Sequence, residues 1–548
     1  MTNTKLTVAD FFCGAGGFSE GFNQAGFNVV FGLDSWKPAI ETHYLNHPDC
    51  TSVHKNILLL NTPKKIDEIV PDTDIIIGSP PCVSFSNSNK SGKSDKSLGI
   101  QLIESYLRIV LYKMTKKDSI LKYWIMENVP NSFKFVKDIY TAKELGLDEN
   151  LPSLNVRNKH ILVASSYGSP QGRKRAICGD YIVPEVTHTK DTFVHIDKIM
   201  EKLGPPIKNN KKFIDDPSFD NISLPPSQVS DHFYDGEIPE ALWKKAKRLK
   251  QDHGYMGKMD FPDRTNRLSR TIMATESFCS RESIIFRKEN TNKYRAPTIR
   301  ELSCLMGFPI DYQFSGNSSN TKHKQIGNAV CIHMSKALGD AIYKKEGLSF
   351  FPDKRSISTL KTNLNNLTTT LFSKYNPKPK KMNSKFHIHV PYLKINQLRV
   401  ELDNTSSDFN KERFVWSCIL HKGSGKTAKN TSLTTSEIFG IINSHKNFKH
   451  IRELFQSIMS EKLNDSCVFQ KKNCNIDVDE IHDAHYSPQE VLDIVSIEIK
   501  KLGVADDKIK CSLLDTKLQY NNPHEYPIEI LFALYLINKT CDNINQTH

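Results

Sequence analysis

The chain has 548 residues, and 74 Lys and Arg against 61 Asp and Glu give it a formal net charge of +13. Hydrophobic residues make up 38% and charged residues 25%, which excludes a wholly disordered chain. The longest apolar runs, such as 161–164, are too short to cross a bilayer, so we expect neither a membrane span nor a signal peptide. We expect a cytoplasmic protein with a polyanionic partner, whose twelve Cys are reduced thiols.

Short apolar runs of β type alternate with helical patterns over the first 180 residues. Strands are expected at 6–12, 29–34, 74–78, 123–126, 160–164 and 176–179, with helices between them at 37–45 and 101–113. This alternation predicts an α/β fold, an open and mostly parallel sheet with helices on both faces. Ligands of such sheets bind in the loops at the carboxyl ends of the strands.

The pattern changes after residue 180. Residues 181–290 are rich in Pro, Asp, Asn and Lys and indicate an irregular second lobe. Beyond 348 the composition indicates a basic linker, followed by a segment with enough apolar residues to fold independently. Further helices are expected at 239–250, 298–306 and 332–343. We therefore divide the chain into 1–180, 181–290, 291–348, 349–384 and 385–548.

A glycine-rich loop, residues 10–19, follows the first expected strand and opens a helix. Its glycines allow a ligand to approach the backbone closely. Asp34 lies 20 residues after Gly14 and ends the second strand, where a carboxylate can hold ribose hydroxyls. A dinucleotide fingerprint would need Gly at Ser19, which argues against a nicotinamide cofactor. For the loop alone, a tight turn without a ligand is the alternative.

Three further signals follow later strands. Cys82 stands after two prolines at a strand end, as a nucleophile or as an inert buried thiol. Glu127 ends another strand, where packing explains a carboxylate poorly and a helix cap is the alternative. Arg173 and Arg175 alternate in the turn before the 176–179 strand, so both would point to one face of an extended segment. A solvated basic loop is the alternative for this turn. The order of these signals on successive loops places a nucleotide-type cofactor, a thiol, a carboxylate and two arginines at one crevice.

Together these stretches resemble the DNA (cytosine-5) methyltransferases over about residues 6–345. Arg300-Glu301-Leu302 with Gly307-Phe308-Pro309 is similar to the ninth motif of that family, and 325–330 to the tenth. The resemblance implies a Rossmann-like methyltransferase domain that uses S-adenosylmethionine. It also implies that 181–290 is a target-recognition lobe and leaves 385–548 as an additional C-terminal domain without an assigned role.

The resemblance also implies roles for individual residues. Cys82 would add to carbon-6 of cytosine, Glu127 would hydrogen-bond N3, and Arg175 with Arg173 would fix the base or orient the glutamate. The nucleotide would have to leave the duplex. No metal is implied. The residues expected at the cofactor are Phe12, Gly14, Ala15, Gly16, Gly17, Asp34, Asn56, Ile57, Pro81, Asn328 and Val330.

Three positions depart from the family pattern. Asn56 replaces an aspartate beside the adenine and could accept from the adenine amino group through its amide oxygen. Val83 replaces a glutamine after the nucleophile, and Cys331 replaces a proline in the last motif. The substitution at 83 removes a polar group near the flipped nucleotide but leaves the nucleophile in place.

The expected function is methylation of cytosine in a short sequence of double-stranded DNA by a monomeric enzyme. Such an enzyme would protect host DNA beside a restriction endonuclease encoded separately. Methylation of tRNA and a non-catalytic DNA-binding regulator are the alternatives. The long 181–290 region favours DNA, and the presence of Cys82, Glu127 and Arg175 favours catalysis.

Three patterns in the C-terminal segment invite other interpretations. Residues 423–427 lack the first glycine of a phosphate loop, since Leu420 stands there, so a basic turn is preferred. Two Cys and two His lack the spacing of a standard zinc finger, and three charged residues could form a nuclease site. For the nuclease set, 487–490 instead predicts the start of a helix. These two sets are Cys467, Cys474, His482 and His485, and Asp483, Glu498 and Lys500.

Overall fold

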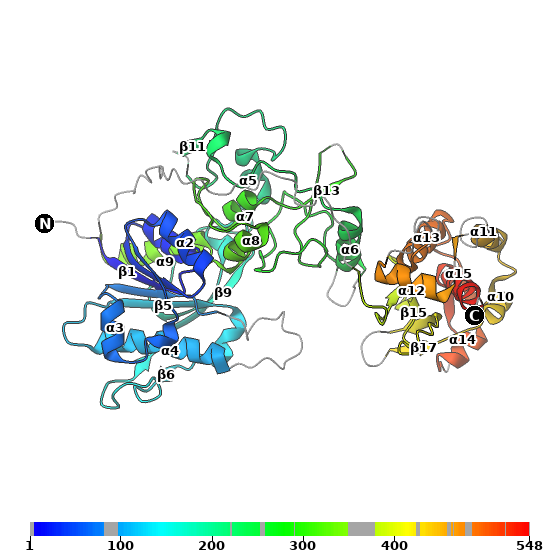
Figure 1. Ribbon diagram of the computed structural model, residues 1–548, viewed down its shortest axis with the longest axis horizontal. Coiled ribbons are helices and arrows are strands. Elements are labelled where there is room, and N and C mark those ends of the chain that lie inside the picture. Colours follow the sequence, from blue (N-terminus) through cyan, green and yellow to red (C-terminus); the bar gives the residue numbers. More distant parts are fainter. Residues whose placement is uncertain are drawn as a thin grey trace. The chain divides into compact units, whose positions relative to one another are not determined.

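The structure is a computed structural model of the full chain (Figure 1). It divides into two compact units, unit 1 with residues 1–243 and 262–373 and unit 2 with residues 244–261 and 374–548. The residues it describes are 5–81, 97–219, 222–252, 258–289, 291–348, 379–423, 428–456, 462–463, 465–476, 485–520 and 522–546.

Unit 1 is built on a seven-stranded sheet with the order β3-β2-β1-β4-β5-β9-β8. The first five strands in that order are parallel, and β9 runs antiparallel to both β5 and β8. The predicted α/β fold with a mostly parallel sheet is confirmed. The strands are β1 (Thr7–Phe11), β2 (Asn28–Asp34), β3 (Thr51–His54), β4 (Ile75–Gly78), β5 (Tyr123–Asn128), β8 (Asn158–Val163) and β9 (Lys174–Asp180), with a separate pair β6 (Ile139–Tyr140) and β7 (Leu154–Asn155).

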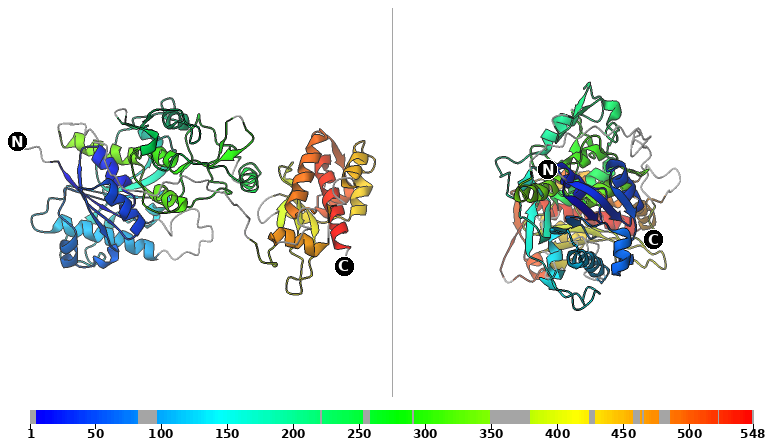
Figure 2. Two further views of the ribbon diagram at one scale, coloured as in Figure 1. Left: turned by 45° about the horizontal axis from the view of Figure 1, so that its top comes forward. Right: turned by 90° about the vertical axis from the view of Figure 1, so that its left-hand side faces the viewer.

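Helices cover both faces of this sheet (Figures 1 and 2). Val8 of β1 belongs to the core beneath α1 and α9, whereas its neighbours Ala9 and Phe11 belong to the core beneath α4. This period of two is what a strand buried on both faces requires. The helices are α1 (Gly17–Gln24), α2 (Lys37–Asn46) and α9 (Ile332–Lys345) on one face, and α3 (Pro63–Ile69) and α4 (Ser97–Thr115) on the other.

An irregular lobe of unit 1 lies between β9 and α9 in the sequence. Polar groups hold much of it together: the ammonium of Lys322 lies 2.7 Å from the carboxylate of Asp231, both almost fully buried. Arg300 is also buried and donates to the carbonyl oxygens of Ser230, Pro309 and Tyr312. The elements are α5 (Ile196–Leu203), β10 (Ile214–Asp215), β11 (Ser223–Leu224), β12 (Phe286–Arg287), β13 (Tyr294–Arg295), α7 (Ile299–Leu305) and α8 (Ser319–Asn328). Helix α6 (Glu240–Gln251) lies in the same stretch of sequence, but most of it belongs to unit 2.

Unit 2 packs helices against a four-stranded antiparallel sheet of order β14-β15-β16-β17. Helix α15 is the centre of its core, since most of its 18 residues are buried. The other elements are β14 (His387–His389), β15 (Leu398–Asp403), β16 (Ser417–Lys422), β17 (Lys429–Thr431), α10 (Thr435–Ile442), α11 (Phe448–Leu454), α12 (Ser466–Cys474), α13 (Pro488–Lys501), β18 (Lys508–Lys510), α14 (Ser512–Lys517), β19 (Glu525–Pro527) and α15 (Ile528–Asn545).

Unit 2 also takes in a short piece of the central chain, residues 244–261. Arg248 donates to the carbonyl oxygen of His389 at 2.7 Å and to the side-chain oxygen of Gln489 at 2.9 Å. The ring of His389 in turn lies 2.9 Å from the carboxylate of Asp252. The sequence-based division treats 181–290 and 385–548 as separate blocks. In the structure, residues 244–261 join a unit whose other residues lie far along the chain, and these polar contacts are within that unit.

Candidate active site

The glycine loop between β1 and α1 is bound by a hydrogen bond to the side chain of Asp34. The amide of Gly14 donates to one carboxylate oxygen of Asp34 at 2.9 Å, and the amide of Trp36 donates to the other at 2.7 Å. Burial raises the pKa of Asp34, which these backbone donors partly oppose. A carboxylate offers about four lone-pair positions, so Asp34 can still accept a hydrogen bond from a ligand hydroxyl.

The loop itself contains three left-handed residues: Phe12 (φ 55°), Gly14 (φ 56°) and Gly16 (φ 90°). Phe12 adopts this conformation at a cost, since it has a β-carbon. A Cβ added to Gly17 would lie 2.4 Å from the carbonyl oxygen of Val330, which is backbone and cannot give way. The turn after α8 therefore closes tightly on the glycine loop. The structure thus brings together the first and the last of the predicted cofactor motifs.

Asn56 and Ile57 follow strand β3, next to β2. The Asn56 side-chain oxygen accepts from the amide of Leu58 at 3.0 Å and caps a short 3-10 helix, Ile57–Leu59. Ile57 is buried. The oxygen expected to face an adenine amino group thus already has one local donor, although a carbonyl oxygen can accept two hydrogen bonds.

The loop that precedes Cys82 is anchored to its neighbours. Ser79 donates through its hydroxyl to the carbonyl oxygen of Phe12 at 3.0 Å. The side chain of Asn128, at the end of β5, donates to the carbonyl oxygen of Pro80 at 3.0 Å. Pro81 is exposed. Cys82 and Val83 lie outside the described residues, so their predicted roles stay predictions.

Glu127 and Arg175 form an ion pair at the carboxyl end of β5. Nε of Arg175 lies 2.8 Å from Oε1 of Glu127, and both side chains are almost buried. Burial raises the pKa of Glu127, while the charges of Arg175 and Arg173 act in the opposite direction. The pairing follows from the sheet, since Glu127 lies opposite Ile177 in the antiparallel β5–β9 ladder. The predicted meeting of this carboxylate with Arg175 is thus found.

Arg173 is bound to main-chain oxygens. Its side chain is 1% exposed and donates to the carbonyl oxygens of Ile272 at 3.0 Å, Gly327 at 2.9 Å and Ala329 at 3.0 Å. Three main-chain acceptors therefore already engage this guanidinium. Its positive charge also favours the ionised form of Glu127.

A family model described as C-5 cytosine-specific DNA methylase matches residues 6–344. The chain belongs to this family. It is a DNA cytosine-5 methyltransferase, and the relationship suggested by its motifs is confirmed. The fold around the paired Glu127 and Arg175 is thus that of a methyltransferase catalytic domain.

Curated relatives agree with this assignment. The chain is 27% identical over 359 residues to the type II methyltransferase M1.HphI of Haemophilus parahaemolyticus, covering 62% of this chain and 87% of that protein. It is 25% identical over 366 residues to M.MthTI of Methanothermobacter thermautotrophicus, covering 62% and 98%. Among solved structures, the methyltransferase EhMeth of Entamoeba histolytica aligns with 17% identity and a TM-score of 0.43, over 62% of this chain and 99% of that one.

The methyltransferase site contains residues that the motifs did not single out. The hydroxyl of Tyr312 donates to the carbonyl oxygen of Ala15 at 2.5 Å and lies 3.2 Å from the ring of His47. Trp36 holds Asp34 through its amide, and the ammonium of Lys324 lies 4.7 Å from the centre of its ring. Tyr312 acts across almost 300 positions of sequence, so no local pattern could reveal it. Trp36 could have been found, because it lies two residues beyond Asp34.

Two basic residues of the 181–290 region have partners within the protein. Arg248 belongs to the polar cluster of unit 2, and Arg270 pairs with Asp263. The ammonium of Lys250 is buried above the ring of Phe261. Lys244 and Lys245 are exposed on α6. The basic composition of this stretch is thus partly structural.

The structure describes some of the residues that suggested a nuclease site, a zinc site or a phosphate loop in the C-terminal segment. Helix α13 begins with a capping box between Ser487 and Glu490, and Glu498 pairs with Lys501 further along it at 2.6 Å. The helix preferred for this stretch is confirmed. Asp483, His482 and residues 424–427 lie outside the described residues. In the parts of the chain that are described, no three His, Cys, Asp or Glu form a metal-binding group, and no helix is both long and apolar enough to span a membrane.

Proposed function

We propose that the enzyme transfers a methyl group from S-adenosylmethionine to carbon-5 of cytosine in a specific sequence of double-stranded DNA. The observation that carries this proposal is the buried pair of Glu127 and Arg175, set beside the anchored loop that leads to Cys82. A carboxyl group with a raised pKa, fixed by an arginine, fits the task of holding N3 of a cytosine.

The glycine loop fits S-adenosylmethionine. A Cβ at Gly14 would have space beside it, while Gly16 and Gly17 let the loop pack closely against Tyr312 and Val330. Asp34 accepts from the amides of Gly14 and Trp36 and can accept further from a ribose hydroxyl. The remaining contacts are assigned to Phe12, Ala15, Asn56, Ile57, Pro81, Asn328 and Val330. When bound, the sulfonium would supply an electrophilic methyl group.

Carbon-5 of cytosine is too weak a nucleophile to accept that methyl group unaided. We assign Cys82 the role of adding its thiolate to carbon-6, which moves an electron pair onto N3 and makes carbon-5 nucleophilic. Glu127 donates a proton to N3 as charge arrives there and takes it back later. Once carbon-5 carries the methyl group, it loses its proton to solvent, and the electron pair of that C–H bond expels the thiolate. The products are 5-methylcytosine, S-adenosylhomocysteine and a proton.

Both faces of the ring must be open for this chemistry, so the target nucleotide has to be extruded from the duplex. We assign sequence recognition to 181–290, where the irregular lobe offers loops rather than a regular surface. Arg175 would hold the extruded base at O2 and Glu127 at N3. Arg173 would act one step further away, through the backbone that it binds.

We also propose that the enzyme is a monomer that protects host DNA from a separately encoded endonuclease. The likeness to type II methyltransferases such as M1.HphI supports this role. Bisulfite sequencing of DNA from bacterial cells that express the protein tests activity and sequence preference together. Protected cytosines should share one short motif, and none should appear with Cys82→Ala. Methyl transfer to tRNA alone would overturn the proposal.

The covalent step has its own test. A duplex that carries 5-fluorocytosine at the identified position should form a denaturant-stable adduct, because fluorine replaces the proton whose loss releases the thiol. Cys82→Ala should form none, while still binding S-adenosylhomocysteine. An adduct with the alanine variant would remove Cys82 from its assigned role.

A further inference from the structure

We propose that Arg173 is a positioning residue that couples the methyl-donor pocket to the DNA-recognition lobe. The inference deepens the proposed function and rests on it. Arg173 lies just before β9 and Arg175 within it, and Arg175 pairs with Glu127 whereas Arg173 donates to three main-chain oxygens. The arrangement around Arg173 assigns it a different task from catalysis.

Arg173 caps the carboxyl end of helix α8. The last carbonyl groups of a helix have no partners within it and carry the negative end of the helix dipole. One Nη atom of Arg173 donates to the oxygen of Gly327, in the last turn of α8, at 2.9 Å, and to that of Ala329, the residue that follows α8, at 3.0 Å. The position of the turn that follows α8 is thereby fixed by a buried cation.

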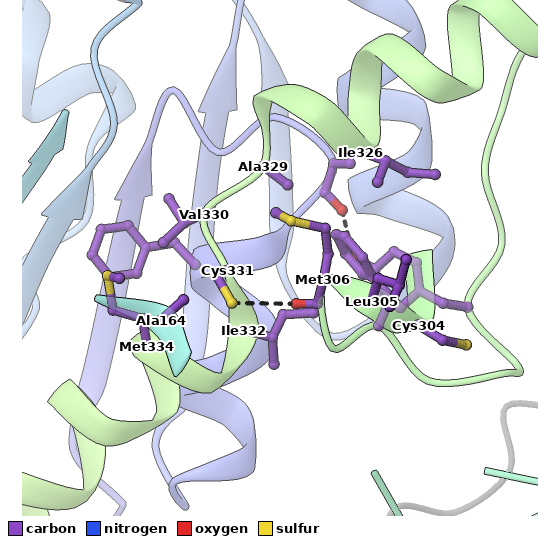
Figure 3. Close-up of a cluster of buried hydrophobic side chains, with 14 of the residues drawn as sticks. Ala164, Cys304, Leu305, Met306, Ile326, Ala329, Val330, Cys331, Ile332 and Met334 are labelled. Carbon is purple, nitrogen blue, oxygen red and sulfur yellow. Dashed lines mark hydrogen bonds between the residues drawn. The ribbon is translucent and has the colours of Figure 1, made fainter. Parts of the chain in front are cut away.

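That turn forms one wall of the predicted cofactor pocket. Its Val330 oxygen packs against Gly17, at the position where a β-carbon would stand. Figure 3 shows Ala329, Val330 and Cys331 on the turn, with the sulfur of Cys331 directed at the carbonyl oxygen of Met306. A ligand that binds against the glycine loop and shifts it will therefore also shift the turn after α8, which Arg173 holds.

The other Nη atom of Arg173 donates to Ile272, in the recognition lobe, at 3.0 Å. Ile272 belongs to a short segment, 269–273, that is bonded on two sides. Its amides at Ser269 and Ile272 donate to Pro170 and to the side chain of Gln171, in the turn that leads to Arg173. On the opposite side, the ring of His323 in α8 lies 2.9 Å from the carbonyl oxygen of Met273.

One planar guanidinium thus bonds to both segments at once. Its donors have a fixed fork geometry, so a shift of the 327–329 carbonyls changes the angle at which Arg173 meets Ile272. Ordering the pocket wall will order segment 269–273, and by reciprocity DNA held by the lobe will favour cofactor binding. A lysine keeps the charge but cannot span all three acceptors with the same geometry.

Hydrogen–deuterium exchange on the full chain tests this coupling without any turnover. S-adenosylhomocysteine should slow exchange in peptides that cover the glycine loop and the turn after α8. It should also slow exchange of the Ser269 and Ile272 amides, by at least about fivefold. With Arg173→Lys, protection of the loop should persist while the added protection of 269–273 disappears. Lys174→Gln, an exposed neighbour, should behave like the wild type.

The wild-type protein alone can overturn the inference. If S-adenosylhomocysteine protects the glycine loop but leaves 269–273 unchanged, the two segments are not coupled, and the proposed function still stands. Equal protection of 269–273 in Arg173→Lys would show that another contact carries the coupling. Failure of S-adenosylhomocysteine to protect any segment would instead remove the proposed cofactor, and this inference with it.

Discussion

Arg175 and Glu127 lie 2.8 Å apart at the end of β5. Burial raises the pKa of the Glu127 carboxyl group, and the charge of Arg175 lowers it. Burial favours the neutral carboxylic acid, whereas a neighbouring cation favours the carboxylate. The proton that Glu127 can offer to a base therefore depends on Arg175. The contributions of the two residues can therefore be measured by substituting each of them separately.

Glu127→Gln should reduce methyl transfer by about two to four orders of magnitude, because an amide cannot shuttle a proton. Binding of S-adenosylhomocysteine, measured by calorimetry, should change little, since Glu127 is not among the expected cofactor contacts. Retention of normal turnover would remove Glu127 from the mechanism.

Arg175→Gln should shift the pH profile as well as lower the rate. Without the cation, the pKa of Glu127 rises further, so the protonated acid persists to higher pH and the alkaline limb moves upward. Rates measured from pH 6 to 10 under single-turnover conditions report this limb. A downward shift would contradict the assigned electrostatics.

Asp10 should make stability fall as pH rises. It is fully buried beneath the glycine loop and accepts from Ser19 at 2.7 Å, and burial raises its pKa from 3.8 to about 8. Between these values the folded state keeps a proton that the unfolded state releases, so this stabilisation is complete below pH 4 and is lost towards pH 8. Urea unfolding at several pH values should show a smaller decline for Asp10→Asn. Asp49→Asn, at an exposed position, should leave the decline unchanged.

Gly17→Ala should loosen the contact between the two cofactor motifs. The new methyl group would meet the Val330 oxygen at 2.4 Å, which we expect to cost about 1–3 kcal/mol of stability and to weaken cofactor binding. Gly172→Ala is the matched control for stability, because a β-carbon there has no neighbour within 4 Å. Equal melting temperatures of the two variants would contradict the close approach.

Arg248→Ala should destabilise unit 2 by about 1–3 kcal/mol, since it leaves the carbonyl of His389 and the amide of Gln489 without their donor. Lys245→Ala, exposed on the same helix, should have little effect. Limited proteolysis, with fragments identified by mass, distinguishes loss of unit 2 from loss of unit 1. Resistance equal to the wild type would show that 244–261 is only loosely held.

The central sheet could be predicted because its inner strands are short apolar runs, and Asp34 and Glu127 are conspicuous as acids at their ends. The edge strand β3 was missed, since none of its four residues is buried. The antiparallel direction of β9 was also missed, because a strand carries no local mark of its orientation.

Arg173 shows where sequence reasoning stops. Its spacing from Arg175 predicted a shared role, but its three acceptors are main-chain oxygens contributed by residues about 100 and 150 positions away. No side-chain pattern records which carbonyl groups will surround a cation. The same holds for Arg248, whose partners are known only once unit 2 is folded.

The interleaved make-up of unit 2 has a consequence for biosynthesis. Residues 244–261 leave the ribosome well before the chain that will enclose them, and α15 comes last. At translation speeds of about 5–20 residues per second, they wait roughly 15–60 s for that partner. During this interval Arg248 lacks its partners in unit 2, and the segment 244–261 is exposed in the incomplete chain. We expect a chaperone to bind the nascent chain at this stage.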